Sequence, residues 1–583
     1  MEAAGKVVTF RRGNDRLCAG DAPYSTPSRQ ASPGPAVPRE AVVATAYPHA
    51  TQAAQEILEA GGNAIDAAVA AAWSLSVCEP SGSGLGGQTT MIIYRHDGTT
   101  VVIDGHSRAP AKASLERISE SQQASGHRAC TIPSTPATLG FAQHKYGALS
   151  PQRTLAPAIH LAENGYPISR LQRRQIRSCL TALRATDSHG VFLEHGRVLR
   201  EGRLLKHPAL ASTLQRLADA GCDDFYHGRL ARSIARDMKA HGGLISRKDL
   251  AACAQPVERE PIAVDYRDYR VLGVPPPGGG LQLLQALKVI ERLAPDGFEK
   301  SSDAWYETMA DVVYAVFGFR ERWPIHAVDF TPSVRRWLLG DELAGELANG
   351  IRCTSLHEPL ETGDEPPGDT THLSVADTQG NVVALTQSVQ SLFGSKVAHP
   401  KLGFFYNNYL VTCPRYRHPS QLAGGCTPRS NVTPTLVMAR DSAGSKTGGD
   451  ISPAPRPVLA IGAAGSRRII SATLQVLSGI LDGGLSIDEA MAAPRIHALL
   501  NGDIWVEKTA LSDSLHQRLC RRYRRVKIKK PLSYTMGAVQ AVQCHGDGSA
   551  SAAADPRRDG TVAVLGADPY PPTNYQPLPG DAS

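Results

Sequence analysis

The sequence predicts an α+β fold, because helix-like and strand-like patterns alternate along the chain. Residues 63–77 (NAIDAAVAAAWSLSV) are small and apolar on every side, which indicates a buried helix, and Asn63 is a typical N-cap. Residues 89–106 form two apolar runs around a turn, a pattern typical of a hairpin. Residues 136–350 have mainly helical patterns. With 42% hydrophobic and 20% charged residues, the composition is that of a globular protein.

Further elements follow in chain order. The folded part is expected to begin near Ala41, where VVATAY predicts a strand, and a helix is expected over His49–Ala60 before two glycines. Ser81–Gln88 is a glycine-rich loop, and the turn Pro275–Gly280 opens another helix. Residues 1–40 are rich in Arg, Ser, Pro and Gly, which predicts a disordered extension.

Charge and cysteine content narrow the function classes. The net charge is +7, and much of it lies in Arg518–Lys530. This stretch fits an acidic partner or a solvated face, and the absence of a nucleic-acid motif favours the solvated face. Eleven scattered cysteines and the absence of H-E-x-x-H or C-x-x-C spacing predict no metal site. No signal-peptide core or membrane span is recognisable, so we expect a cytoplasmic protein without nucleic-acid or membrane partners.

The most informative stretch begins with a polar, acidic, proline-rich segment, Thr354–Asp369, which we interpret as an exposed linker. Residues 371–388 (THLSVADTQGNVVALTQS) then predict a hairpin that turns at Thr378–Gly380. If Gln379 is the centre of the turn, Thr370 lies opposite Ser388. Directly opposed residues have Cβ atoms about 4.5–5.5 Å apart, so the two hydroxyl groups are expected to touch.

A threonine hydroxyl needs a base before it becomes a good nucleophile. If the chain is cut before Thr370, the new α-amino group supplies that base, since its pKa lies near 8. The cut itself would use the same hydroxyl, which attacks the Asp369 carbonyl in an N→O acyl shift. Ser388 would orient or polarise the Thr370 hydroxyl. The turn Gly462–Ser466 follows an apolar strand and precedes a helix, so its amides fit an oxyanion hole or simply a tight turn.

Four blocks of the chain are similar to the γ-glutamyltranspeptidase family, and with weaker matches they cover roughly residues 41–568. They are AYPHATQAAQEILEAGGNAIDAAVAAAWSLSVCEPSGSGLGG, DGHSRAPAKA, DTTHLSVADTQGNVVALTQSVQSLFGSKV with GFFYNN, and NVTPTLVM through GAAGSRRII to AMAAPRIHALL. The resemblance implies an αββα four-layer sandwich of the N-terminal-nucleophile type without a cofactor. It also implies a precursor that cleaves itself between Asp369 and Thr370 into a large subunit, 41–369, and a small subunit, 370–583.

The resemblance also implies site residues. Thr370 matches the nucleophile, Ser388 the second hydroxyl, and Ala464 and Gly465 the oxyanion donors. The substrate-binding positions match less well. The family's carboxylate-binding arginine falls at His106, with Arg108 two residues on as a replacement, and its asparagine falls at Gln390. The family's residues that hold the substrate amino group fall at Tyr409 and Thr412. Its two paired serines fall at Ser430 and Asn431, so one of them is replaced by asparagine.

Three functions remain open at this point. The first is a γ-glutamyltransferase or glutathione hydrolase, with glutathione or another γ-glutamyl compound as substrate and water or an amine as acceptor. The second is an acylase or amidohydrolase that uses the same scaffold on a non-glutamyl amide. The third is an inactive binding homologue, which the presence of both Thr370 and Ser388 disfavours.

Overall fold

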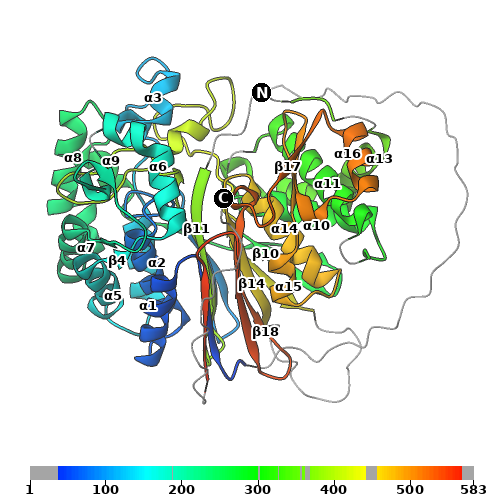
Figure 1. The fold of residues 1–583 in the computed structure, drawn as a ribbon, viewed down its shortest axis with the longest axis horizontal. Helices are drawn as coiled ribbons and strands as arrows, with labels where there is room; N and C mark the ends of the chain where they lie inside the picture. The colour runs from blue at the N-terminus through cyan, green and yellow to red at the C-terminus, as the bar shows by residue number, and fades with distance from the viewer. Residues whose placement is uncertain are drawn as a thin grey trace, which may run out of the picture. The chain divides into compact units, whose positions relative to one another are not determined.

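The computed structural model describes residues 37–566 except 187, 189, 300–301, 326, 355–356, 361–367 and 441–455. Most of the predicted extension, 1–40, and much of the predicted linker, 354–369, therefore lie outside the described residues. Two β-sheets stack face to face, and helices cover the outer face of each sheet (Figure 1). This arrangement confirms the expected αββα sandwich.

The first sheet has seven strands, and each neighbouring pair is antiparallel. In order across the sheet they are β20 (Thr561–Leu565), β1 (Ala41–Thr45), β11 (Gly368–Ala376), β12 (Val382–Ser391), β2 (Gln88–Tyr94), β3 (Thr100–Gly105) and β8 (Val257–Arg259). The hairpin β11–β12 lies at the centre of this sheet, where both of its edges are paired.

The second sheet has six strands, again antiparallel throughout. Its order is β19 (Ala550–Ala554), β18 (Ala538–Cys544), β14 (Pro457–Ala464), β13 (Thr435–Ala439), β10 (Tyr269–Gly273) and β9 (Ile262–Tyr266). Smaller sheets are β15 (Ile496–Ala498), β16 (Asp503–Glu507) and β17 (Arg525–Lys529), then β4 (Tyr166–Pro167) with β7 (Leu204–Leu205), and β5 (Leu193–Glu194) with β6 (Arg197–Val198).

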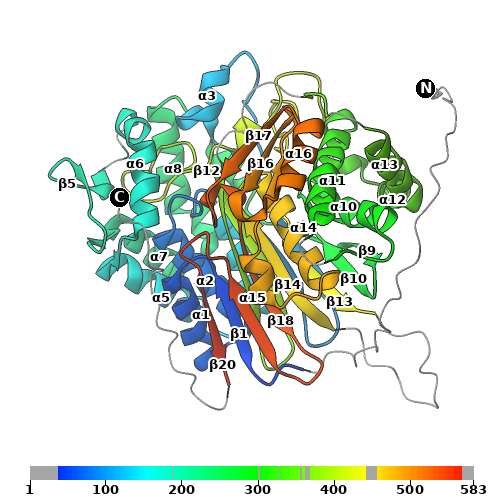
Figure 2. The same ribbon diagram turned by 45° about the vertical axis from the view of Figure 1, so that its right-hand side comes forward.

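Helices from the first part of the chain belong to the side of the first sheet. They are α1 (Pro48–Glu59), α2 (Ala64–Cys78), α3 (Glu120–Ala124), α4 (Thr135–Tyr146), α5 (Pro151–Asn164), α6 (Arg170–Ala185), α7 (Pro208–Ala220), α8 (Arg229–Ala240) and α9 (Arg247–Ala252). The other side has α10 (Gly280–Leu293), α11 (Asp303–Arg322), α12 (Pro332–Leu338), α13 (Asp341–Cys353), α14 (Arg468–Leu481), α15 (Ile487–Ala492) and α16 (Asp513–Arg522). Figure 2 shows α14 and α15 lying over β14 and β18.

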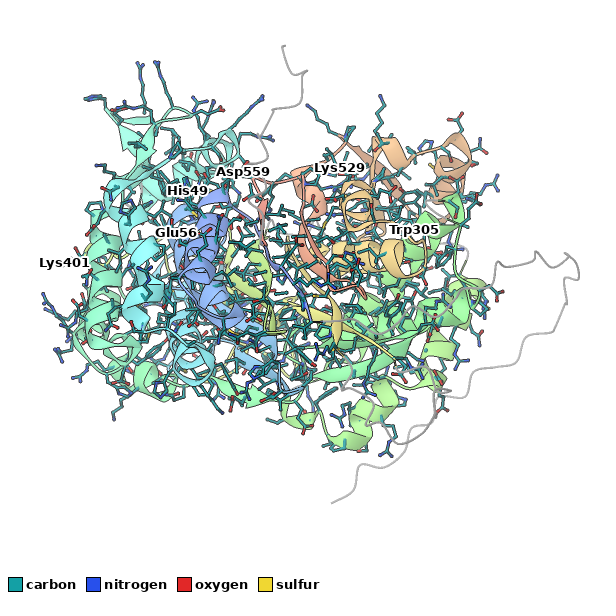
Figure 3. The ribbon with its side chains drawn as sticks, turned by 90° about the horizontal axis from the view of Figure 1, so that it is seen from below. His49, Glu56, Trp305, Lys401, Lys529 and Asp559 are labelled. Atoms are coloured by element: carbon teal, nitrogen blue, oxygen red, sulfur yellow. The ribbon has the colours of Figure 1, made fainter. Side chains whose placement is uncertain are left out.

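Three apolar layers hold these parts together. One fills the space between the first sheet and its helices, a second the space between the second sheet and its helices, and a smaller third the space between the two sheets. Seen from below in Figure 3, His49 and Glu56 of α1 lie in one helical layer and Trp305 of α11 in the opposite one. Within the described ranges, no helix combines the length and apolar composition needed to cross a membrane.

Helix α2 matches the sequence prediction closely. Its side chains are buried along the whole element, and the Asn63 side chain accepts hydrogen bonds from the amides of Ile65 and Asp66, each at 3.0 Å. The Asn63 backbone amide in turn donates to the Asp66 carboxylate, which completes a capping box. The predicted buried helix and its N-cap are both confirmed.

The prediction that residues 136–350 are mainly helical is confirmed, although the stretch also contains short strands. This part is mainly helical, but it also supplies β8 to the first sheet and β9 and β10 to the second. The pair β9–β10 is a hairpin whose turn contains Arg267 with φ at 55°. These strands are only three to five residues long, and the flanking segments have helical patterns, so sequence periodicity did not identify the strands.

Candidate active site

The hydroxyl groups of Thr370 and Ser388 meet in the structure. Thr370 lies near the start of β11 and Ser388 near the end of β12, and their oxygens are 3.1 Å apart. The two oxygens also lie 2.7 and 2.9 Å, respectively, from the carbonyl oxygen of Asp369. Both side chains are buried. Two hydroxyl groups thus lie beside the carbonyl group of the peptide bond at which the sequence predicts cleavage.

The hairpin register explains this contact. Thr371 pairs with Gln387 and Ala376 with Val382, which is the register expected from a turn centred at Gln379. A bulge then separates this ladder from the pair Asp369–Gln390. Gln390 adopts φ of 84°, and its amide donates to the Ser388 hydroxyl at 2.9 Å. The bulge therefore fixes the Ser388 oxygen from its own strand, a common role of bulges near active sites.

A buried arginine anchors the Asp369–Thr370 peptide. The Arg558 guanidinium donates to the Thr370 carbonyl oxygen at 2.8 Å and forms an ion pair with the Asp369 carboxylate. It also pairs with Glu79, 3.2 Å away at the C-terminal end of α2. All three charged side chains are buried. The network joins three segments that are distant in sequence.

Two further residues complete the surroundings of Asp369. The Gln175 amide of α6 donates to the second Asp369 oxygen at 3.2 Å and to the Tyr534 hydroxyl at 3.1 Å. The Tyr534 ring lies beneath the Arg558 guanidinium, 4.9 Å from ring centre to cation. Sequence analysis did not identify these four residues around Asp369, because no local motif indicates them. They are Arg558, Glu79, Gln175 and Tyr534.

The charges in this network are unequal. Burial raises the pKa of Glu79 to about 8, and the neighbouring Arg558 offsets only part of that effect while Asp369 adds to it. For Arg558, the opposing charges of Asp369 and Glu79 outweigh burial and raise its pKa further. The buried network therefore favours the charged form of Arg558 and disfavours the charged form of Glu79.

The glycine-containing turn after β14 lies beside the start of β11. A Cβ added to Gly368 would come within 2.6 Å of the Ser466 Cβ, which shows how closely the turn approaches the nucleophile strand. Gly465 has φ of 128°, a conformation that favours glycine. The turn after β14 therefore lies next to the strand that carries Thr370.

The two cation candidates for substrate binding differ in their surroundings. The His106 Nδ1 atom lies 2.5 Å from Asp104, whose other oxygen pairs with Arg259 at 2.9 Å. Burial opposes the charge of Asp104, but His106 and Arg259 together hold the pKa of that carboxyl well below its ordinary value. Arg108 is exposed and lies near Cys253, where its charge counteracts the effect of burial on the thiol pKa.

Tyr409 is in direct contact with the nucleophile centre. It lies in the short 3-10 helix η5 (Tyr409–Thr412), and the side chains of Ser388, Gln88 and Ser430 surround its hydroxyl closely enough to affect its pKa. Burial raises its pKa, so the group stays neutral. Ser430 also meets Gln88 at 3.4 Å. A neutral phenol therefore occupies the wall of the site next to Ser388.

The remaining candidates are tied into the same wall. The Asn431 side-chain oxygen accepts from Arg320 at 2.6 Å, and Arg320 also donates to the Ser430 carbonyl at 3.1 Å. The Thr412 hydroxyl donates to the backbone carbonyls of Tyr409 and Arg429. In this structure, Thr412 and Asn431 hold the backbone of the wall together.

His372 shares a strand face with Thr370 but points between the sheets. Its ring hydrogen-bonds with Thr386 at 2.8 Å and Ser374 at 3.1 Å, and a Cβ on Gly462 of β14 would lie 2.4 Å from it. Burial lowers its pKa to about 3. These contacts support a packing and hydrogen-bonding role rather than proton transfer.

One group of side chains outside this centre has metal-ligand chemistry. His127, Asp237 and His241 carry ligand atoms within 4.8 Å of one another. The two imidazole rings are stacked, however, with centres 4.4 Å apart and planes 10° apart. Their lone pairs therefore lie in two nearly parallel, separate planes, so the rings as placed do not both aim at one metal position.

The Arg558 network predicts a large effect on stability. Arg558→Met should lower the free energy of unfolding by about 3–5 kcal/mol, because it leaves Asp369 and Glu79 buried without their cation. Arg270→Met is a matched control, since Arg270 makes only a 4.0 Å surface pair with Asp265, and its effect should stay below about 1 kcal/mol. Urea unfolding followed by circular dichroism measures both. Equal stability of the two variants would contradict the anchoring role of Arg558.

Comparison with known proteins agrees with the fold and this geometry. A family model described as gamma-glutamyltranspeptidase matches residues 50–565. The glutathione hydrolase proenzyme of Escherichia coli (strain K12) is 31% identical over 546 residues, which cover 89% of this chain and 90% of that protein. The acylase ACY 1 proenzyme of Pseudomonas sp. (strain SE83) is 31% identical over 556 residues, covering 91% and 95%.

A solved structure is similar over nearly the whole chain. The cephalosporin acylase from Bacillus halodurans superposes with a TM-score of 0.79 and 27% identity, covering 94% of this chain and 99% of that one. Its coverage includes both sheets and both helical layers. The chain belongs to the γ-glutamyltranspeptidase family and has the fold of its N-terminal-nucleophile hydrolases.

Proposed function

We propose that this chain is the precursor of an amide hydrolase or transferase that cleaves itself between Asp369 and Thr370 and then uses Thr370 as its nucleophile. The observation that carries the proposal is the placement of the Thr370 and Ser388 hydroxyls, 2.7 and 2.9 Å from the Asp369 carbonyl oxygen. The products are a large subunit that ends at Asp369 and a small subunit, 370–583. The family's glutathione hydrolase and acylase proenzymes support this reading.

In the first step, the Thr370 hydroxyl oxygen attacks the Asp369 carbonyl carbon. Ser388 donates to the carbonyl oxygen and polarises it, and Arg558 holds the peptide through the Thr370 carbonyl and the Asp369 carboxylate. The Asp369–Thr370 C–N bond breaks, the nitrogen gains a proton, and Asp369 becomes an ester on Thr370. The proton comes from the Thr370 hydroxyl, so the shift itself frees the α-amino group. Water then hydrolyses the ester, which releases the Asp369 carboxyl group and restores the Thr370 hydroxyl.

In the second step, that amine is the general base for the Thr370 hydroxyl, since its pKa near 8 leaves part of it neutral. The hydroxyl oxygen attacks the substrate carbonyl, the substrate C–N bond breaks, and the amine leaves with the proton that the α-amino group took up. The amides of Ala464 and Gly465 would stabilise the developing oxyanion. Water releases the acyl group as an acid, or an amine acceptor takes it as a new amide.

Self-cleavage is tested with single hydroxyl deletions. Thr370→Ala should leave the chain intact, because the attacking oxygen is gone, and Ser388→Ala should slow cleavage by weakening carbonyl polarisation. Thr90→Ala in neighbouring β2 is the control, since it removes a buried hydroxyl without a hydrogen-bond partner among the described residues, and should cleave normally. Denaturing gels sampled over time give the rates. A Thr370→Ala chain that still splits before residue 370 would refute the assignment.

Two classes of substrate acyl group fit the site, one with an α-ammonium group and one without. A γ-glutamyl compound such as glutathione fits the family, with His106, Gln390, Tyr409 and Ser430 as the wall. A non-glutamyl amide is favoured by one observation: neutral Tyr409 and Thr412 lie where the family binds the substrate ammonium, and each makes contacts within the protein. We therefore propose an acyl group without an α-ammonium, as in the second class.

This proposal predicts a substrate order. Glutaryl anilide, which lacks the ammonium group, should have a kcat/KM at least about tenfold above γ-glutamyl anilide, because a charged hydrogen bond contributes about 1.5–3 kcal/mol only where its partner exists. Tyr409→Glu should restore a partner and reverse the order. A butyryl anilide reports whether the terminal carboxylate matters. Strong preference of the unmodified protein for the γ-glutamyl compound would instead establish the first class.

A further inference from the structure

Two cysteines lie at the two ends of the segment that connects η5 with Ser430. Cys413 directly follows η5, which carries Tyr409, and Cys426 lies four residues before Ser430. Their sulfur atoms are 3.7 Å apart, and both are thiols in this structure. Residues 413–426 form the connecting loop between them.

The backbone holds both sulfurs in place from independent directions. The Gln123 side chain donates to the Cys413 carbonyl at 3.0 Å, and the Ala109 amide donates to the Cys426 carbonyl at 2.9 Å. Cys413 also packs in a small apolar cluster with Leu410 and Leu422. The proximity of the two sulfurs is thus built by the fold around the connecting loop rather than by the loop alone.

We propose that Cys413 and Cys426 form a thiol–disulfide exchange site, which reacts with a small-molecule disulfide and closes a disulfide across the connecting loop. A disulfide bond has a sulfur separation of about 2.05 Å, so closure needs a shift of less than two ångströms shared between two side chains. Neither cysteine belongs to the nucleophile centre. The site therefore adds a chemistry distinct from amide cleavage.

The reaction is balanced as two exchanges. The Cys426 thiolate attacks one sulfur of the small disulfide, forms a mixed disulfide and releases one small thiolate. Cys413 then loses its proton and attacks the Cys426 sulfur, which releases the second small thiolate. The two protein thiols are oxidised by two electrons, the small disulfide is reduced to two thiols, and the two protons end on those thiols.

The surroundings assign the roles within the pair. Cys426 is partly exposed and Cys413 is buried, so an incoming disulfide reaches Cys426 first. Hydrogen bonding from Cys413 lowers the pKa of Cys426 to about 7, whereas the same contact and burial raise the pKa of Cys413. Cys426 is therefore the attacking thiol and Cys413 the resolving thiol.

The bond would restrain the wall of the active site. Thr412, which precedes Cys413, and Arg429, three residues after Cys426, already hydrogen-bond to each other, and Ser430 lies near the Tyr409 hydroxyl. A covalent link at the base of the loop limits how far these two stretches separate. This consequence for catalysis rests on the proposed function, whereas formation of the disulfide does not.

The test treats the full native protein with bis(2-hydroxyethyl) disulfide, which contains no glutamyl group and so cannot serve as a γ-glutamyl substrate. Free thiols are then blocked under denaturing conditions, and trypsin is added. Cys413 and Cys426 fall in separate tryptic peptides, 402–415 and 418–429. We expect these peptides to be joined, two hydrogen atoms lighter than their sum, and to separate after reduction.

Single variants make the result decisive. Cys413→Ser should trap the mixed disulfide on Cys426, and Cys426→Ser should leave Cys413 unmodified because it is buried. Exposed Cys520 on α16 reports that the reagent is active. The inference is overturned if Cys520 is modified while peptides 402–415 and 418–429 stay separate. It is also overturned if the protein without substitutions accumulates only a stable mixed disulfide on Cys426. Joined peptides with unchanged turnover would support the exchange site and remove its link to catalysis.

Discussion

The buried ion network of Arg558 is the constraint on which the active site depends. A guanidinium ion inside the protein is stable only with close, hydrogen-bonded partners. Here those partners are the Asp369 carboxylate, the Thr370 carbonyl and Glu79. The network forces the end of α2, the start of β11 and the segment before β20 to meet at one point. That point is the peptide bond proposed for cleavage, so the interaction that stabilises the fold also positions its chemistry.

The β11–β12 hairpin turns this anchoring into a reactive geometry. Its regular ladder runs up to Thr371, and the bulge then shifts the partner strand so that the Ser388 hydroxyl faces the Asp369 carbonyl. On the same face, neutral His372 fills the space against Gly462 and locks β11 to the second sheet. The strand that carries Thr370 is therefore packed against the second sheet through His372. Tyr409 lies next to Ser388 on another side of the hydroxyl pair.

The parts of this account that follow from local sequence were predictable. Asn63 and the apolar stretch after it define α2, and the turn at Gln379 fixes the register that brings Thr370 to Ser388. The Arg558 network was not predictable from one sequence, since Arg558 lies 188 residues from Thr370 and 479 from Glu79 and no spacing marks the contacts. The contact of Tyr409 with Ser388 was also hidden, because it depends on a loop path that the sequence pattern does not determine.

The central claim is that Thr370 carries the acyl group, and acyl-enzyme mapping tests it most directly. The processed protein is mixed briefly with a slow acyl substrate, quenched in acid and digested with trypsin. Peptide 370–396 contains both Thr370 and Ser388, so fragmentation mass spectrometry must place the added mass within it. The account predicts the acyl group on Thr370, with Ser388 unmodified. An acyl group on Ser388 or on another peptide during normal turnover would contradict it.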